Sequence, residues 1–400
     1  MVPESQVNMS KSRLLFMVAL LAASLPSVAD DLYVRQDALG LEVRVPEPPS
    51  WVAARDGRHA LYELSIANLR RHELRLEKIE VIDATNDQIL LTLSGEALRQ
   101  ATARRGWDGP EAETTLWRGG QHGTVFVELL ADAGAASLPT QLRHRLYATS
   151  PAPATGSGAA QKRWVLETQT VPFGPAPLRL SAPLKGPGWL AGNALSNESD
   201  HRRSIIPVNG RAGIAQRYAI DWVRIGPHGR PAKTESGANA EYFGYQEPVL
   251  AVASGRIAAV KDGIAENVPR STEMAVPMTL ETVAGNYVLL ELQGAYVLYA
   301  HLEPGTIRVH PGETVDRGQV IGLLGNSGQS DAPHLHLHVT DRPASLAGEG
   351  RPYVFETFRY RGSVGNLDQW WDSGEPWQPE ADTWRTLELP LDGDVVDFPP

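Results

Sequence analysis

The sequence predicts a mostly β protein with two folded domains, and three observations lead to this prediction. Its 400 residues are enough for two domains, because a domain usually takes about 100 to 200 residues. Its 37 glycines and 30 prolines are more than an average chain carries, which favours short strands joined by turns. Short runs in which apolar and polar residues alternate recur along the chain, as half-buried strands require.

Composition and charge exclude several partners and several kinds of chemistry. Acidic residues outnumber basic ones by 47 to 37, and a net charge of -10 would repel a phosphate backbone, so we expect no nucleic-acid partner. The chain has no cysteine, which excludes disulfides, thiolate metal ligands and a cysteine nucleophile. Any metal must therefore be held by histidine, aspartate or glutamate. The composition does not indicate an oligomeric state.

The first 29 residues are predicted to be a signal peptide. Lys11 and Arg13 precede the apolar run 14–25, and the small residues at 27–29 fit a signal-peptidase site. We therefore expect an exported protein, either periplasmic or secreted. At about 1.5 Å per residue the apolar run is too short to span a bilayer, so an uncleaved anchor is the weaker alternative. No integral membrane segment is expected after cleavage of the signal.

Residues 30–182 are predicted to form an antiparallel β-sandwich of immunoglobulin-like size. Alternating apolar runs recur here, separated by turn-rich stretches, at 41–45, 62–66, 74–81 and 125–129. Such a series of short strands is typical of immunoglobulin-like sandwiches, although the cysteine pair of true immunoglobulin domains is missing. Residues 183–200, in which Gly, Pro, Asn and Ser interrupt all periodicity, are predicted to be a linker.

A second, compact β domain is predicted from residue 201 to residue 345. Pairs of strands around turns fit residues 249–260 and 288–299. The remaining residues, 346–400, are predicted to be a C-terminal extension whose aromatic side chains pack onto a domain surface. Trp370 and Trp371 also allow a different hypothesis, in which the whole chain is an adhesive or glycan-binding β protein with tryptophans as stacking platforms.

The most informative segment is the run Pro333-His-Leu-His-Leu-His-Val339. Side chains on a strand alternate between its two faces, so the apolar residues would face the core while His334, His336 and His338 share the other face. Such a run is rarely expected by chance, and neutral imidazole is the commonest side-chain metal ligand. A polar face exposed to solvent is the weaker alternative. The run therefore predicts a metal site.

Two residues elsewhere stand out as partners for these histidines. Asp221 lies in an otherwise apolar strand pattern at 218–223, where a lone carboxylate needs a cation or hydrogen bonds. A buried ion pair with an arginine is the alternative explanation. His301 ends another apolar strand, and taken alone it is more typical of a satisfied core histidine. A catalytic zinc usually has three protein ligands and one open position, so at least one further ligand is expected.

Four motifs in the second half of the chain resemble those of the lysostaphin and LytM type of zinc metallopeptidase, metallopeptidase family 23. They are Tyr299-Ala-His-Leu302, Val315-Asp-Arg-Gly-Gln-Val-Ile-Gly322, Gly325-Asn-Ser-Gly328 and Pro333-His-Leu-His336. Their order and their spacing both agree with the family. The resemblance covers roughly residues 201–345.

The resemblance implies a twisted antiparallel β-sheet domain of the duplicated hybrid motif type, with Zn²⁺ in a groove. It also implies hydrolysis of peptide crosslinks in bacterial cell-wall peptidoglycan, with stem peptides as the substrate. Asp221 and His336 match two zinc ligands of the family, while His301 and His334 match its two unliganded histidines beside the reacting water. On this interpretation the chain is an exported zinc metalloendopeptidase, in which zinc activates water and imidazoles move protons.

One position departs from the family pattern. The family's first zinc ligand is a histidine four residues before the aspartate, but this chain has Arg217 there, and a protonated guanidinium cannot ligate zinc. In one hypothesis His201 supplies the third ligand, with His228 as the weaker choice. In the other, zinc is absent or loosely held, and the chain is an inactive homologue that binds the cell wall or activates another hydrolase.

Overall fold

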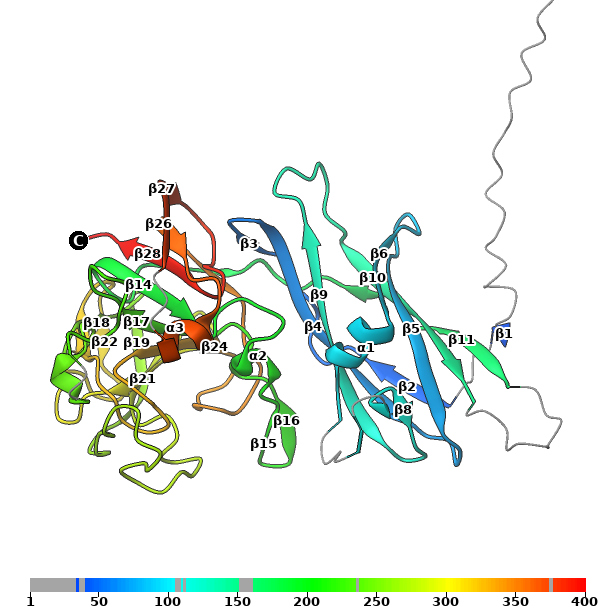
Figure 1. The fold of residues 1–400 in the computed structure, drawn as a ribbon, viewed down its shortest axis with the longest axis horizontal. Helices are drawn as coiled ribbons and strands as arrows, with labels where there is room; N and C mark the ends of the chain where they lie inside the picture. Colours follow the sequence, from blue (N-terminus) through cyan, green and yellow to red (C-terminus); the bar gives the residue numbers. More distant parts are fainter. Residues whose placement is uncertain are drawn as a thin grey trace, which may run out of the picture.

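The computed structural model describes residues 34–35, 40–104, 109–110, 113–150, 161–234, 237–373 and 377–400. The predicted signal peptide, residues 1–29, lies outside these ranges. Two β-rich bodies lie side by side, one from the N-terminal and one from the C-terminal part of the chain (Figure 1). Within the described ranges, no helix is long and apolar enough to cross a membrane.

The N-terminal body is a sandwich of two β-sheets. The first sheet has the order β1-β11-β10-β5-β6 with β12 beside β10 and β8 beside β5, and the second has the order β2-β4-β9-β7 with β3 beside β4. The bounds of these strands are β1 (Val34–Arg35), β2 (Leu41–Arg44), β3 (Val52–Ala54), β4 (Gly57–Asn68), β5 (Leu74–Asp83), β6 (Ile89–Ser94), β7 (Thr102–Ala103), β8 (Leu116–Trp117), β9 (His122–Ala131), β10 (Gln141–Thr149), β11 (Arg163–Glu167) and β12 (Val171–Pro172). Neighbours run antiparallel apart from β1 and β11. An immunoglobulin-like topology for this sandwich stays a prediction.

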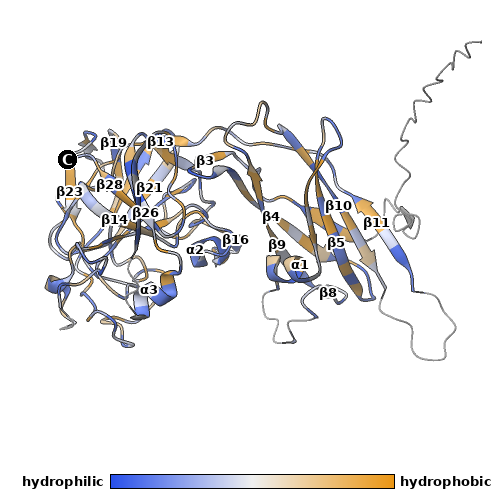
Figure 2. Ribbon diagram, turned by 45° about the horizontal axis from the view of Figure 1, so that its top comes forward, coloured by the Kyte–Doolittle hydropathy of each residue, from blue (hydrophilic) through white to orange (hydrophobic). Residues whose placement is uncertain are grey.

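Apolar side chains from both sheets meet between them and form the core of the sandwich. Tyr62 and Leu64 of β4 pack there with Ile79 and Val81 of β5, and each of the four is at most 1% exposed. The short helix α1 (Gly95–Ala101) adds its buried Leu98 to the same core. Figure 2 shows the apolar residues that recur along these strands, as the alternating sequence pattern predicts.

The C-terminal body is built on one ten-stranded antiparallel sheet, so the prediction of a mostly β, antiparallel fold is confirmed. Its strand order is β22-β19-β20-β21-β24-β17-β14-β28-β26-β27. The bounds of these strands are β14 (Gly186–Gly192), β17 (Ile220–Arg224), β19 (Gly255–Lys261), β20 (Asn286–Leu292), β21 (Ala295–Leu302), β22 (Thr314–Val315), β24 (Leu335–Thr340), β26 (Phe358–Ser363), β27 (Gln378–Arg385) and β28 (Asp394–Phe398).

Short pairs of strands and short helices complete this body. The strand pairs are β13 (Leu178–Leu180) with β25 (Tyr353–Phe355), β15 (Ile206–Val208) with β16 (Arg211–Gly213), and β18 (Pro248–Leu250) with β23 (Val320–Leu323). The helices are α2 (Asp200–Arg203), the 3-10 helix η3 (Asn239–Glu241) and α3 (Leu367–Ser373). In Figure 1, α2 lies between the two bodies.

The ten-stranded sheet extends beyond the residues that the sequence assigned to the second domain. β14 lies within residues 183–200, the predicted linker, and β26, β27 and β28 lie within the predicted extension 346–400. β14 pairs with β17 on one side and with β28 on the other. Trp189 and Leu190 of β14 are 0% and 1% exposed, so burial of these side chains stabilises the strand. The glycines around them interrupt the apolar periodicity from which a strand would be predicted.

The two bodies are packed against each other through β3 and β4. Val52, Ala54 and Leu61 of these strands belong to the hydrophobic core of the C-terminal body rather than to that of the sandwich. The backbone N–H of Leu389 donates a hydrogen bond of 2.9 Å to the carbonyl of Ala53. The sandwich is therefore part of the packing that surrounds the C-terminal sheet.

His144 is predicted to make the stability of the sandwich depend on pH. This residue of β10 is 0% exposed, its Nε2 lies 2.8 Å from the Tyr62 hydroxyl, and burial lowers its pKa to about 4. An unfolded histidine has a pKa of about 6.5, so as the pH falls the unfolded chain takes up this proton first. The resulting contribution to stability is complete above about pH 6.5 and is lost between about pH 6.5 and 4, roughly 3 kcal/mol in all.

Denaturant unfolding at about pH 7 and about pH 4.5 tests this prediction. His144→Gln removes the titrating ring, so the difference in unfolding free energy between the natural chain and the variant should shrink at the lower pH. The same difference at both pH values would contradict a neutral, buried His144.

Candidate functional site

Strand register brings the predicted aspartate and the predicted histidine together. β17 and β24 are antiparallel neighbours, and Asp221 lies directly opposite His336. Residues that face each other across such a pair project to the same side of the sheet. On the other side of β24, Leu335 and Leu337 are 0% exposed in the core, so the predicted alternation of this segment is confirmed.

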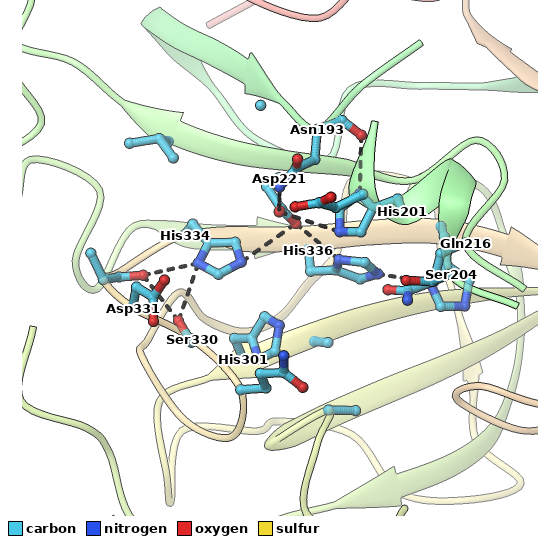
Figure 3. Close-up of a pocket in the computed structure, with 18 of the residues that line it drawn as sticks. Asn193, His201, Ser204, Gln216, Asp221, His301, Ser330, Asp331, His334 and His336 are labelled. Carbon is cyan, nitrogen blue, oxygen red and sulfur yellow. Dashed lines mark hydrogen bonds and ion pairs between the residues drawn. The ribbon is translucent and has the colours of Figure 1, made fainter. Parts of the chain in front are cut away.

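The carboxylate of Asp221 is the centre of the cluster (Figure 3). Its Oδ1 is 2.9 Å from Nδ1 of His336 and 3.4 Å from Nε2 of His334. Its Oδ2 is 3.3 Å from Nε2 of His201. The potential ligand atoms of His201, Asp221 and His336 all lie within 4.8 Å of one another. His301 joins the group through ring contacts, with its centroid 4.7 Å from that of His334.

Backbone carbonyls fix the orientation of three of these rings. Nδ1 of His201 lies 3.0 Å from the carbonyl oxygen of Asn193, Nδ1 of His334 lies 2.9 Å from that of Ala332, and Nδ1 of His301 lies 2.7 Å from that of Ser327. A carbonyl oxygen only accepts, so each Nδ1 carries the proton and donates. Whenever such a ring is neutral, its Nε2 carries the lone pair that metal binding or proton acceptance requires.

His336 is held by a different partner. Its Nε2 lies 2.8 Å from Nδ1 of His338, and this contact leaves Nδ1 of His336 turned toward Asp221. His338 is 0% exposed. The sequence placed His338 on the same strand face and left open whether it contacts a metal ligand or is exposed, and the structure places it in contact with His336.

Asn193 is a site residue that the sequence did not indicate. It directly follows β14, its side-chain amide donates to Oδ2 of Asp221 at 3.1 Å, and its carbonyl accepts from His201. Its φ of 48° is in the left-handed region, which asparagine enters more readily than most residues. Asn193 falls in the predicted linker, so its position at the site becomes evident only from the pairing of β14 with β17.

His301 also has an unusual backbone conformation. Its φ is 64°, in the left-handed region that few residues other than glycine adopt. Its backbone N–H donates to the carbonyl of Ala284 at 3.1 Å while its ring donates to Ser327, so both ends of the residue are held. The register of β21 against β20 is irregular at this point, and the His301 ring lines the cavity.

Burial and charge set the protonation of the cluster. Burial by itself would raise the pKa of Asp221, but the neighbouring His201 and His334 and the hydrogen bonds to the carboxylate hold this pKa well below its usual range. Burial lowers the pKa of His336 to about 4 and also lowers the pKa of His301. Burial alone would lower the pKa of His334, but the charge of Asp221 raises it above its ordinary value. At neutral pH the site therefore combines an ionised carboxylate with the neutral imidazoles of His336 and His301, and carboxylate and imidazole donors suit a divalent cation.

Arg217 does not take part in this cluster. Its guanidinium donates to Oε2 of Glu63 at 2.8 Å and to Oε2 of Glu349 at 2.7 Å, and its side chain is only 3% exposed. His201, on α2, lies beside Asp221 instead. His228 is exposed and does not line the cavity, so of the two histidines considered for the vacant ligand position only His201 is near Asp221.

The cluster lies on the wall of a cavity of about 560 Å³. α3, from the C-terminal extension, lines another part of it with Trp370 and Trp371. The indole N–H of Trp370 donates to the carbonyl of Gly229 at 2.7 Å and the residue is 3% exposed, so this aromatic side chain of the extension is packed, whereas Trp384 is 61% exposed. Further lining residues are Asn193, Asp200, Ser204, Ile206, Ala284, Gln329, Ser330, Asp331 and Leu367.

Comparison with known proteins finds a peptidase family that matches part of the C-terminal body. Residues 240–347 match the model of Peptidase family M23, a segment that includes His301, His334 and His336. Asp221 and His201 lie before the matched segment. The predicted resemblance to this type of peptidase is therefore confirmed over this segment of the chain.

Short segments of the chain also align with curated proteins. The peptidoglycan DD-endopeptidase ShyA of Vibrio cholerae is 46% identical over 65 residues, which is 16% of this chain and 15% of that protein. An uncharacterized metalloprotease of Haemophilus influenzae is 36% identical over 100 residues, which is 22% of this chain and 20% of that protein. The chain thus spans no more than a fifth of the length of these relatives.

Solved structures align over longer stretches at lower identity. The catalytic domain of lysostaphin from Staphylococcus simulans is 24% identical and aligns with 30% of this chain and 86% of its own, with a TM-score of 0.18. The catalytic domain of the prophage-encoded M23 protein EnpA from Enterococcus faecalis is 17% identical and aligns with 41% of this chain and 91% of its own, with a TM-score of 0.25.

Replacing Arg217 is predicted to destabilise the fold. Arg217→Met leaves the buried Glu349 carboxylate without its arginine and Glu63 with one arginine instead of two, and breaking a buried ion pair in this way costs about 3 to 5 kcal/mol. Arg211→Met is the matched control, because that side chain is 57% exposed and its loss is expected to change stability by about 0.5 kcal/mol or less. Urea unfolding measures both, and equal small effects would refute a structural role for Arg217.

Proposed function

We propose that this protein is a zinc metalloendopeptidase that hydrolyses peptide crosslinks of bacterial peptidoglycan. The observation that carries the proposal is the convergence of His201, Asp221 and His336, whose potential ligand atoms lie within 4.8 Å of one another. Peptidase family M23, matched over residues 240–347, supports the class of reaction.

The residues present fit a catalytic zinc ion. Two imidazole nitrogens and one carboxylate oxygen are a usual ligand set for catalytic zinc, which keeps its fourth position open for water. The rings are already oriented by partners behind them, the Asn193 carbonyl for His201 and His338 for His336. Such outer partners raise the basicity of the ligands and fix their direction.

The remaining histidines have the geometry for proton transfer. Zinc bound here would supply a Lewis acid for the scissile carbonyl and lower the pKa of its water. Nε2 of His301 has a free lone pair beside the cavity, because Nδ1 donates to Ser327, and it is placed to accept a proton. His334, with Nδ1 held by Ala332 and Nε2 toward Asp221, is placed to donate to a developing oxyanion once protonated. No serine or cysteine nucleophile is needed.

The proposed substrate class rests on the relatives, and the proposed location rests on the first residues of the sequence. Two Vibrio cholerae proteins that align with this chain, ShyA and ShyB, are peptidoglycan DD-endopeptidases. We further propose export, periplasmic or secreted, on the signal-peptide pattern of residues 1–29, since crosslinked stem peptides lie outside the cytoplasm. The alternative function is that of an inactive homologue that binds the cell wall or activates another hydrolase.

Zinc stoichiometry tests the metal site. We expect about one zinc per chain after metal stripping, reconstitution and washing, and a clear loss of affinity in His201→Ala, because a three-ligand site loses one of its donors. His228→Ala is the matched control, since this histidine is exposed and away from the cavity. Elemental analysis and chelator competition measure both, and a His201→Ala chain that binds zinc as tightly as the natural one would exclude His201 as a ligand.

Cleavage of purified crosslinked muropeptides separates the two functions. His301→Ala is expected to keep its zinc and to lose roughly 10²- to 10⁴-fold in rate, since a proton-transfer group is removed and no ligand is. A natural chain that holds zinc but releases no product from these substrates would favour the inactive homologue.

A further inference from the structure

The helix that carries His201 is attached to the sandwich by the very next residue. Arg202 is 0% exposed, and its guanidinium forms an ion pair with the carboxylate of Glu63 in β4. The same guanidinium donates to the carbonyl of Tyr62 at 2.8 Å and lies 4.9 Å from the ring centre of Phe126 in β9. In Figure 1, α2 lies beside these strands of the sandwich.

α2 cannot hold this position by its own helical structure. It contains four residues, whereas an isolated helix needs about 12 to 15 residues to be even marginally stable. Within the C-terminal body its neighbourhood is held by the Ser199 hydroxyl, which donates to the carbonyl of Asn193 at 2.7 Å, and by the His201 ring on the same oxygen. Arg203 reaches the sandwich as well, donating to the carbonyl of Gln100 at 2.9 Å.

Glu63 is the anion on which the Arg202 contact depends. The charges in this buried cluster balance as two arginines, Arg202 and Arg217, against Glu63 and Glu349, and the four residues are 0 to 5% exposed. Glu349 reaches Arg217, while Arg202 forms its ion pair with Glu63. An arginine buried without its anion is strongly disfavoured, so loss of the Glu63 charge acts directly on the residue next to His201.

We propose that Glu63 of the sandwich is a positioning residue for His201, so that the N-terminal sandwich completes the metal site of the C-terminal body. The family histidine position is occupied by Arg217, which also binds Glu63. The Glu63 carboxylate thus binds Arg217, which occupies the family histidine position, and also Arg202, which lies on the helix that carries His201. The inference rests on the proposed zinc site but concerns how that site is assembled.

Glu63→Gln tests the proposal in the full-length chain. The variant keeps the shape of the side chain and removes its charge, and we expect zinc affinity to fall roughly 10- to 100-fold, as for other changes behind a metal ligand, toward the value of His201→Ala. Glu349→Gln is the matched control, because it makes the same change in the same cluster without touching Arg202, and it is expected to keep the natural affinity. Chelator competition measures zinc affinity in all of these chains.

Amide hydrogen exchange in the metal-free chain gives a readout that needs no zinc. Residues 193–204 are expected to exchange at least about tenfold faster in Glu63→Gln than in Glu349→Gln, while β24 stays unchanged. Equal exchange and equal zinc affinity in the two variants would overturn the proposal. If the natural chain binds no zinc, the proposed function fails, and the exchange measurement still decides whether Glu63 positions α2.

A double variant covers the case in which Glu63→Gln does not fold. Glu63→Gln with Arg202→Met removes the link and leaves Arg217 paired with Glu349, so the cluster stays balanced. We expect it to fold and to show the same fall in zinc affinity and the same faster exchange at 193–204. Natural values for both measurements in this double variant would also overturn the proposal.

Discussion

The site depends on placing one ionised carboxylate where water cannot fully solvate it. Asp221 comes from β17, whose Ile220 and Trp222 face the core. Three histidines and the side-chain amide of Asn193 are directed at its carboxylate. The register of β17 against β24 sets one of the histidine contacts, and the loop before β24 and the helix α2 set the others. A buried negative charge without these partners would be expensive, so folding and assembly of the site are one process.

Each histidine is in turn bonded behind the site to a group that fixes its ring. Three of these groups are backbone carbonyls, and backbone carbonyls are placed by the strands and turns rather than by rotatable side chains. The backbone fold therefore determines the direction in which Nε2 of each of these three rings points. This arrangement also explains the left-handed backbone at His301, since that conformation turns the ring toward the Ser327 carbonyl and the cavity.

Much of this site can be predicted from the sequence, because strand alternation is a local property. Side chains of residues 334–339 alternate between the two faces of a strand, so the face of each can be predicted. Asp221 stands out as a lone charge in an apolar pattern. The role of Asn193 cannot be predicted in this way, since it depends on the pairing of β14 with β17 across a stretch rich in glycine. The environment of Arg217 is equally non-local, because Glu63 lies 154 positions away in the chain and belongs to the other body.

The strand order of the C-terminal sheet has a consequence for how the chain folds. β14, which leads into Asn193, lies between β17 and β28, and β28 ends at Phe398. β14 therefore lacks one of its two neighbours until residues 394–398 have joined the sheet, and contacts so distant in sequence close slowly. The sandwich can therefore form while the sheet that carries the site still lacks one of its strands.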